Sequence, residues 1–239
     1  MTRFSPRLLL LGFVTLITIT TCRPAPEPEP TPDEIVQNAA QRMSQLTGFH
    51  FAIAHNGPPA YLDPDNVVSL VRMDGDYVAP DRARAAVLIK LTGFVTKVDV
   101  ISVADVQWQT NPLTGKWEEL PSNWGFNPAV LFDAEIGLQT ILAADTSELV
   151  LIGKEKLEDG PDAGLYALTG KVAGDRLFQM SGGLIGPAAA DAQLWVMPET
   201  FELVRVILTE PAVDGADSPS VWQVDFANYE QTVEIKPPM

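Results

Sequence analysis

Residues 49–54, Phe49-His50-Phe51-Ala52-Ile53-Ala54, alternate large apolar side chains with smaller or polar ones. A period of two residues predicts a β-strand with one buried face. The residues before this strand have a different pattern. Thr31-Pro32-Asp33-Glu34 is a capping box with proline at the first helical position, which predicts a helix over residues 33–47 that stops at Gly48. The chain therefore changes from one helix to strands at about residue 48.

Short strands separated by tight turns are predicted along most of the remaining chain. We expect Asp74-Gly75 to follow a strand at Val67–Met73 as its turn, and the alternating Ala85, Val87, Ile89 and Leu91 to form the next strand. Further strands are expected at residues 98–103, 106–110, 116–120, 149–156, 164–172, 177–180, 193–196, 203–208, 222–226 and 232–235. Gly, Pro or Asp turns connect most of them, which predicts an antiparallel sheet.

A second helix interrupts the strands in the middle of the chain. Asn127 is expected to cap this helix and Pro128 to open it. Its apolar face comprises Leu131, Ala134, Leu138 and either Ile141 or Leu142. The pattern as a whole predicts an α+β fold with one antiparallel sheet of about ten strands and two helices. A sheet of that length curls, and the part of its apolar concave side that two helices leave uncovered predicts an apolar cavity.

Cys22 is the one cysteine of the chain, and it follows a segment built as an export signal. Arg3 and Arg7 precede an apolar stretch over residues 8–19, which is shorter than the roughly 20 residues that span a bilayer. The end of this segment, Ile19-Thr20-Thr21-Cys22, resembles the bacterial lipobox, in which the cysteine is lipidated and the preceding peptide is removed. Thr21 stands where that pattern usually has Gly, Ala or Ser. The alternative is an incidental cysteine in a signal peptide that is cut elsewhere, or in an uncleaved anchor.

These observations predict three parts: a lipoprotein signal peptide at 1–21, a lipidated cysteine with a proline-rich tether at 22–32, and a single domain at 33–239. Proline at every second position of the tether favours an extended polyproline II chain, so its ten residues after Cys22 reach roughly 30 Å. More than one acyl chain on the cysteine would hold the protein durably. We expect the domain at the extracytoplasmic face of the cell membrane, in the cell envelope or periplasm.

The composition favours a folded and strongly acidic domain. Apolar residues make up 46% of the chain, and the net charge is −15. Removal of residues 1–21 would leave 14 basic and 31 acidic side chains, a net charge of −17. Such a charge repels phosphate backbones, so we expect no nucleic-acid partner.

Candidates for catalysis or metal binding are weak. The two histidines, His50 and His55, are five residues apart on one predicted strand and so point to opposite faces. Ser181, in Met180-Ser181-Gly182-Gly183, lacks the glycine pattern of a nucleophile elbow. Phosphate-binding and dinucleotide-binding glycine motifs are also missing from the sequence. We therefore predict a binding or carrier protein without a cofactor, a metal or an enzymatic activity.

Several segments together carry a resemblance. They are the lipobox with its linker, the helix at 33–47, Val71-Arg72-Met73-Asp74-Gly75, Ala79-Pro80-Asp81-Arg82, Phe126-Asn127-Pro128-Ala129-Val130-Leu131-Phe132, Leu194-Trp195-Val196 with Pro198-Glu199-Thr200, and Val224-Asp225-Phe226-Ala227-Asn228-Tyr229-Glu230. In this order they resemble the LppX/LprAFG lipoproteins, whose fold is similar to the periplasmic carriers LolA and LolB. The resemblance covers nearly the whole chain after the signal peptide.

The resemblance implies a half-open antiparallel barrel, closed on its concave face by helices, with a cavity that holds the acyl chains of lipids or glycolipids. It also implies transport of these lipids across the cell envelope, with a transporter as a possible partner. The family has no short binding motif, so the lining is inferred from the pattern alone. We expect it to comprise Phe51, Val87, Ile89, Leu131, Leu138, Ile141 and Leu142. The alternative for each residue is ordinary packing of helix on sheet.

Three other functions stay open at this point. A LolA-like sensory or regulatory lipoprotein would act through protein contacts, and a structural envelope lipoprotein would have a filled core. A lipid hydrolase would require Ser181 to lie in a pocket beside His50 or His55.

Overall fold

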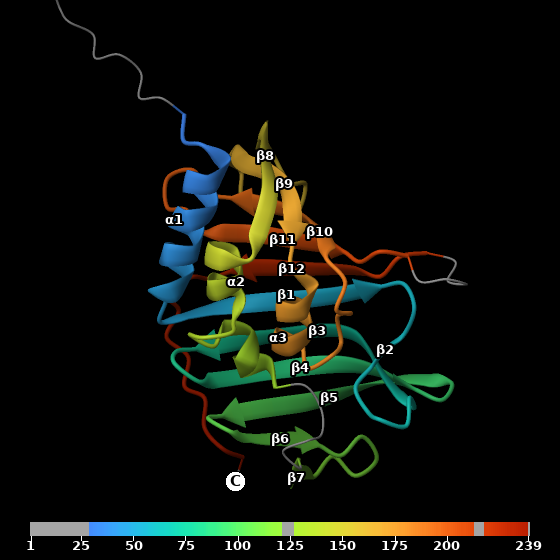
Figure 1. Ribbon diagram of the computed structural model, residues 1–239. Helices are drawn as coiled ribbons and strands as arrows, with labels where there is room; N and C mark the ends of the chain where they lie inside the picture. Colours follow the sequence, from blue (N-terminus) through green and yellow to red (C-terminus); the bar gives the residue numbers. More distant parts are fainter. Residues whose placement is uncertain (1–28, 121–126, 213–217, 239) are drawn as a thin grey trace, which may run out of the picture.

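One antiparallel sheet frames the protein, and the helices lie on its concave face (Figure 1). The computed structural model describes residues 29–120, 127–212 and 218–238. Its helices are α1 (Pro32–Ser44), the 3-10 helix η1 (Pro128–Phe132), α2 (Leu138–Ala144) and α3 (Gly174–Met180). Its strands are β1 (Gly48–Asn56), β2 (Ala60–Tyr61), β3 (Val68–Val78), β4 (Arg82–Leu91), β5 (Phe94–Val103), β6 (Val106–Thr110), β7 (Trp117–Glu119), β8 (Thr146–Glu155), β9 (Leu165–Val172), β10 (Ala190–Val196), β11 (Leu203–Thr209) and β12 (Val221–Ala227).

The order of the strands explains the position of the central helices. The sheet runs β7-β6-β5-β4-β3-β1-β12-β11-β10-β9-β8, with β2 paired to β3. The chain proceeds from β1 in the middle to β7 at one edge, then resumes with β8 at the opposite edge and returns until β12 pairs with β1. The chain must therefore cross a face of the sheet between β7 and β8. The helices η1 and α2 form part of this crossing.

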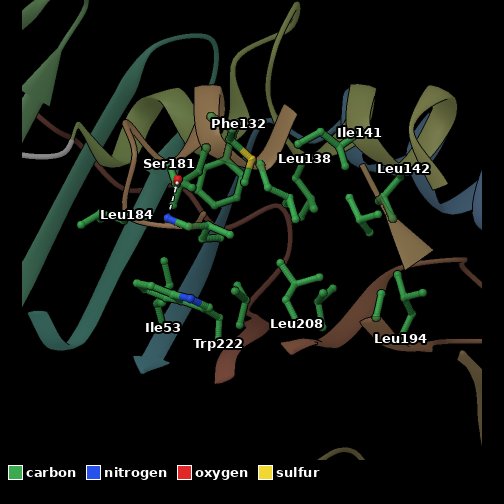
Figure 2. A pocket seen from close by; sticks show the side chains of 18 of the residues that line it. Ile53, Phe132, Leu138, Ile141, Leu142, Ser181, Leu184, Leu194, Leu208 and Trp222 are labelled. Atoms are coloured by element: carbon green, nitrogen blue, oxygen red, sulfur yellow. Dashed lines mark hydrogen bonds between the residues drawn. The ribbon is translucent and has the colours of Figure 1, made fainter. Parts of the chain in front are cut away.

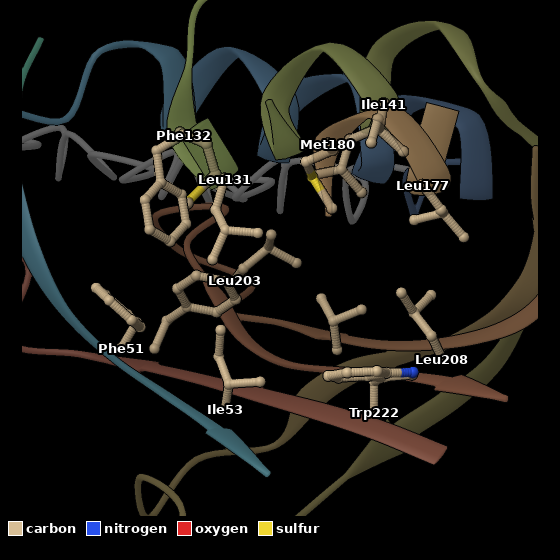
Figure 3. Close-up of a cluster of buried hydrophobic side chains, with 14 of the residues drawn as sticks. Phe51, Ile53, Leu131, Phe132, Ile141, Leu177, Met180, Leu203, Leu208 and Trp222 are labelled. Atoms are coloured by element: carbon tan, nitrogen blue, oxygen red, sulfur yellow. The ribbon is translucent and has the colours of Figure 1, made fainter. Parts of the chain in front are cut away.

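A group of aromatic rings fixes η1 to the middle of the sheet. The ring of Phe132 lies 4.7 Å from that of Phe49, 4.9 Å from Tyr77 and 5.4 Å from Phe51, measured between ring centroids. Phe49 and Phe51 are 1% and 0% exposed. Figure 3 shows Phe132 and Leu131 pointing from η1 toward Phe51 and Ile53 of β1. Offset and edge-on ring contacts add about 0.5–1.5 kcal/mol per pair to the burial of apolar surface, so Phe132 is the main apolar anchor of η1.

The expected fold class is confirmed, and the described residues form twelve strands instead of about ten. The first helix is also confirmed as α1, and its capping box is formed: Thr31 Oγ1 accepts a hydrogen bond from the Glu34 amide at 3.3 Å, and the Glu34 carboxylate accepts one from the Thr31 amide at 2.8 Å. The expected strand at 49–54 lies within β1.

The prediction of one continuous second helix is wrong, because the segment divides into η1 and α2. Asn127 caps η1 as expected, through a hydrogen bond from the Ala129 amide to Asn127 Oδ1 at 2.9 Å. Asp133 then leaves the helical conformation with ψ at 141°. Its carboxylate accepts hydrogen bonds from the amides of Glu135 and Ile136 at 2.8 and 3.1 Å, which stabilises a turn in place of another helical turn.

Three further predictions of secondary structure are wrong. Asp74-Gly75 is not a turn but continues β3, where a Cβ on Gly75 would lie 2.3 Å from the Arg84 carbonyl oxygen. This glycine permits close approach of β4 and does not bend the chain. Residues 177–180 belong to the helix α3, which buries Leu177 and Met180 at a spacing of three residues. Residues 232–235 form no strand, although Ile235 is buried and its carbonyl accepts a hydrogen bond from Arg82 at 3.0 Å.

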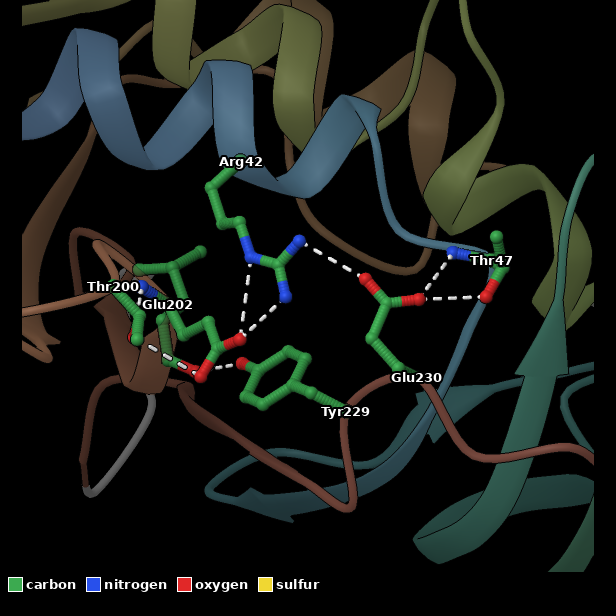
Figure 4. Close-up of polar contacts among 7 residues, drawn as sticks. Arg42, Thr47, Thr200, Glu202, Tyr229 and Glu230 are labelled. Atoms are coloured by element: carbon green, nitrogen blue, oxygen red, sulfur yellow. Dashed lines mark hydrogen bonds and ion pairs between the residues drawn. The ribbon is translucent and has the colours of Figure 1, made fainter.

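Ion pairs attach the C-terminal turn of α1 to two loops at the end of the sheet (Figure 4). The guanidinium of Arg42 pairs with the Glu202 carboxylate at 2.6 Å and with the Glu230 carboxylate at 3.0 Å. Glu230 also accepts hydrogen bonds from the Thr47 hydroxyl at 2.7 Å and the Thr47 amide at 3.4 Å. The hydrogen bonds from Thr47 and the nearby Arg42 charge lower the pKa of Glu230 from its ordinary value of 4.5.

We expect Glu230→Gln to reduce the loss of stability in acid. A carboxylate with a lowered pKa in the folded state stabilises the protein above the pKa of the unfolded chain, and this contribution is lost as the pH falls through the folded value. The variant should therefore be less stable than the wild type at neutral pH, and the difference should narrow below pH 4.5. Urea unfolding at several pH values measures this. Glu199→Gln, in an exposed turn, is the matched control, and a constant difference for Glu230→Gln at all pH values would contradict the assignment.

The aromatic anchor predicts a large effect for Phe132→Ala. Removing a buried phenylalanine side chain costs about 3–5 kcal/mol of unfolding free energy. Phe178→Ala is a suitable control, because Phe178 is 45% exposed, and it should cost under about 1 kcal/mol. Denaturant unfolding provides both values, and equal losses for the two variants would show that Phe132 does not anchor η1.

Candidate functional site

A hollow lined by apolar side chains lies between the helices and the C-terminal half of the sheet (Figure 2). We call it the apolar hollow. The sheet contributes Ile53, Leu70, Val172, Ala192, Leu194, Val206, Leu208, Trp222 and Val224 to its lining; the helices contribute Leu131, Phe132, Leu138, Ile141, Leu142, Leu177 and Met180; and the loop after α3 contributes Ser181, Leu184 and Ile185. Figure 2 shows Leu138, Ile141 and Leu142 of α2 facing Leu194, Leu208 and Trp222 across it.

The apolar hollow is narrow in this structure. Its enclosed free volume is about 60 Å³, and about 810 Å³ when the adjoining unfilled space that opens to solvent is included. Pockets for small molecules usually measure about 300–1,000 Å³. The enclosed part has room for only a few water molecules, so a larger ligand requires the helices to move away from the sheet.

Ser181 contributes a hydroxyl to the lining, and this hydroxyl is used in hydrogen bonds within its own loop. Ser181 Oγ accepts a hydrogen bond from the Ile185 amide at 2.9 Å and donates to the Phe178 carbonyl at 3.4 Å. Neither histidine lines the hollow. His50 lies on the outer face of β1, where its Nδ1 is 3.0 Å from Asp76 Oδ1. Ser181 is therefore not paired with either histidine, as the hydrolase alternative would require.

Glu210 joins two segments at the rim of the apolar hollow, the loop after α3 and the strand β12. Its carboxylate accepts hydrogen bonds from the Gly186 amide at 2.7 Å and from Trp222 Nε1 at 2.8 Å. Thus one side chain joins the loop after α3 to a tryptophan that lines the hollow. The ring of His55 packs on Trp222 at 4.3 Å between centroids, and burial lowers the pKa of His55 while the charge of Glu210 opposes this.

The sequence pattern does not predict the contacts of Glu210. Glu210 and Gly186 are far apart in the chain and belong to different loops. The one sequence signal was the indole N–H of Trp222, which requires a hydrogen-bond partner when buried.

The predicted lining residues separate into three groups. Leu131, Leu138, Ile141 and Leu142 border the apolar hollow. Val87 and Ile89 border a second, smaller hollow beneath β3 to β6. Phe51 borders neither of the two, because it is covered by Phe132. Cys22 lies outside the described residues. Leu177 and Met180 were missed, since residues 177–180, which belong to α3, were predicted as a strand.

The described residues include no group of histidine, cysteine and acidic side chains that could hold a metal ion. Within the same part of the chain, no helix has the length and hydrophobicity needed to cross a membrane.

Comparisons with known proteins agree with this architecture. The sequence pattern of the LppX_LprAFG lipoproteins matches residues 31–235. The crystal structure of LprF from Mycobacterium bovis is similar with a TM-score of 0.66 and 15% sequence identity, over 88% of this chain and 98% of LprF. The crystal structure of the Mycobacterium tuberculosis lipoprotein LppX is similar with a TM-score of 0.60 and 15% identity, over 86% of this chain and 98% of LppX.

At this level of identity the two structures establish the fold alone. No protein with a curated description matches the sequence. The family match extends from the start of α1 to Ile235 and so includes every helix and strand of the described residues. The chain belongs to the LppX_LprAFG lipoprotein family.

Proposed function

We propose that the protein binds the acyl chains of lipids in the apolar hollow and carries them across the cell envelope. The observation that carries this proposal is the lining of the hollow, in which apolar side chains come from both the sheet and the helices. The two polar groups that reach it, the Ser181 hydroxyl and the Trp222 indole N–H, already have partners. Such a lining provides no free hydrogen-bonding group for a polar ligand, and its apolar side chains suit an aliphatic chain.

The energetics favour this ligand. Each buried methylene contributes about 0.8 kcal/mol, so ten methylenes contribute about 8 kcal/mol. A membrane lipid does not cross an aqueous compartment alone at a useful rate, because exposing its chains to water costs this free energy. When the lipid is bound, the apolar lining of the protein surrounds the chains in place of the membrane.

Binding requires the apolar hollow to widen, and α2 is the element suited to move. It has seven residues, and Gly137 at its N-terminus supplies no side-chain cap. Polar side chains attach both of its ends to neighbouring segments. At the C-terminal end Gln37 donates to the Ala143 carbonyl at 2.8 Å, and at the N-terminal end Gln139 donates to the Phe132 carbonyl at 3.0 Å. Few hydrogen bonds must break for this short helix to move.

The proposed location follows from the N-terminal segment. Lipidation of Cys22 would hold the domain at the extracytoplasmic face of the membrane, and the tether would let it reach roughly 30 Å from the surface. A transporter in the same membrane is a suitable source or acceptor of the lipid.

A structural lipoprotein with a filled core is the second candidate. The enclosed volume of about 60 Å³ favours this candidate, since a core that only stabilises the fold is expected to be nearly filled by its own side chains. The two functions differ in one measurable property, the uptake of an acyl chain.

We expect Leu138→Trp to weaken the uptake of a fluorescent acyl lipid from vesicles. Leu138 is partly exposed at the start of α2, so an indole can be accommodated while it occupies space that the ligand needs. A loss equivalent to two methylenes would lower affinity roughly tenfold. Leu113→Trp is the control, because Leu113 is 85% exposed in a distant turn. Equal uptake by the two folded variants would exclude α2 as a wall of the binding site, and no uptake by the wild type would favour the structural candidate.

We expect Glu210→Ala to loosen the attachment of the loop after α3 to Trp222 at the rim of the apolar hollow. The Gly186 amide and the Trp222 indole N–H would lose their acceptor, so amide hydrogen exchange in residues 182–188 should accelerate and Trp222 should become more accessible to a fluorescence quencher. Glu199→Ala, in an exposed turn, should leave both signals as in the wild type. Unchanged exchange in the Glu210 variant would mean that the rim is held by its apolar contacts.

A further inference from the structure

Four large apolar side chains are exposed together at one end of the sheet. They are Tyr61, Val67, Phe94 and Val95, which are 42%, 41%, 50% and 53% exposed. We call them the tip patch. Single apolar residues are ordinary on a protein surface, but a contiguous group marks a site of contact with a membrane or with another protein.

The pairing of the strands places these residues side by side. Tyr61 ends β2, which is paired to the start of β3 just after Val67. The next residue, Val68, pairs with Leu91 at the end of β4, and Leu91 pairs with Phe94 at the start of β5. Neighbouring strands lie about 4.8 Å apart, so the tip patch extends over the ends of four strands. Figure 1 shows β2 and the turn between β4 and β5 on the side of the sheet opposite α1.

The turn between β4 and β5 holds part of the tip patch out into solvent. Thr92 and Gly93 alone join the two strands, and Gly93 has a φ of 102°. A Cβ on Gly93 would meet no atom within 4 Å, so the turn projects from the surface. A two-residue turn of this kind places Phe94 and Val95 directly at the tip of the hairpin.

The tip patch adjoins a wall of the apolar hollow. Ala60, which precedes Tyr61, pairs with Leu70, and Leu70 lines the apolar hollow. Val68 and Leu91, beside the patch, are partly buried and pack against the core. A bilayer in contact with the tip patch would therefore lie close to the apolar wall that we propose receives acyl chains.

The charge near the tip patch differs from that of the whole chain. The chain has a net charge of −15, whereas residues 61–69 and 90–97, which carry the patch, contain two acidic and two basic side chains, a net charge of zero. A negatively charged membrane surface repels the chain as a whole but not this segment of it. The end of the sheet with the tip patch is therefore suited to approach a bilayer.

A bilayer fits the size of the tip patch better than a protein partner does. A stable protein interface buries about 800 Å² on each partner, which is more than four half-exposed side chains at a narrow tip provide. A second copy of this chain would also bring an equal negative charge. Insertion into a bilayer needs no such area, because each apolar side chain that enters the membrane adds to the affinity.

We infer that the tip patch inserts into the surface of a lipid bilayer while the protein exchanges lipid with it. The expected tether reaches roughly 30 Å, and β5, with its ten residues, is about 33 Å long. A tether of that length allows the domain to turn until the tip patch meets the membrane that holds it. The purpose of this contact rests on the proposed function, but the contact itself is measured without lipid uptake.

Fluorescence quenching tests the insertion in the lipoprotein held in phosphatidylcholine vesicles. Phe94→Cys supplies a thiol for the environment-sensitive fluorophore NBD, since lipidation would occupy Cys22, the one cysteine of the chain. Its emission should shift to shorter wavelength and be quenched by lipids with a nitroxide on the acyl chain. Val106→Cys is the matched control, because Val106 is 36% exposed and pairs with Val103 at the opposite end of β5. The control label should be quenched by iodide in the water instead.

A second variant tests whether lipid exchange uses the tip patch. Phe94→Ser combined with Val95→Ser changes two exposed side chains, so the fold should be retained. The rate at which a fluorescent acyl lipid is taken up from vesicles should fall about tenfold, because the burial of a phenylalanine in the bilayer is lost. The amount bound at equilibrium should be unchanged, since the apolar hollow is intact. Val106→Ser should retain the rate of the wild type.

The outcomes separate this inference from the proposed function. Equal quenching of both labels by iodide would overturn the membrane contact, and so would a label at position 94 that neither quencher reaches because a second copy covers it. An uptake rate unchanged by the two serines would overturn the use of the tip patch in lipid exchange. If the wild type takes up no lipid, the proposed function fails, and quenching at position 94 by nitroxide lipids still decides whether the tip patch enters the bilayer.

Discussion

The fold depends on the need to cover the concave apolar face of a long sheet. The sheet begins in its middle at β1 and is completed when β12 returns beside it, so the chain has to pass from the edge at β7 to the edge at β8. The segment that makes this passage covers the face at the same time. Phe132 fixes it to the central strands, and α2 continues it over the C-terminal half. The apolar hollow is the space that this cover leaves unfilled.

The helices that cover the concave face of the sheet are attached to it by different contacts at their two ends. At one end, aromatic rings from β1, β3 and η1 pack into a continuous group, and Arg42 attaches α1 to two loops. Over the apolar hollow, the lid comprises two helices of seven residues each and a loop that Glu210 and Ser181 retain. The proposed opening would therefore involve the short helices over the apolar hollow and leave the aromatic group in place.

The sequence predicted the elements whose signals are local. The capping box at Thr31 and the alternation at residues 49–54 were confirmed, because caps and side-chain alternation depend on neighbouring residues. Gly75 was misread as a turn, since its small size serves the approach of β4, which only the tertiary structure shows. The segment of α3 was also misread, because four apolar and polar residues fit either a strand or one helical turn.

The site was predicted only in part for a related reason. Helical spacing placed Leu131, Leu138 and either Ile141 or Leu142 on one face, and all four of these residues border the apolar hollow. The position of Phe51 beneath Phe132 depends on how η1 crosses the sheet, which the pattern does not encode. The contacts of Glu210 likewise follow from the order of the strands in the sheet.

Native mass spectrometry of the lipoprotein extracted from a membrane tests the central claim, that a widened apolar hollow holds a lipid. A lipid carrier should give a population whose mass exceeds that of the processed chain by one diacyl lipid, which is released when the collision energy is raised. Only the mass of the free lipoprotein, both on extraction and after incubation with lipid vesicles, would contradict it.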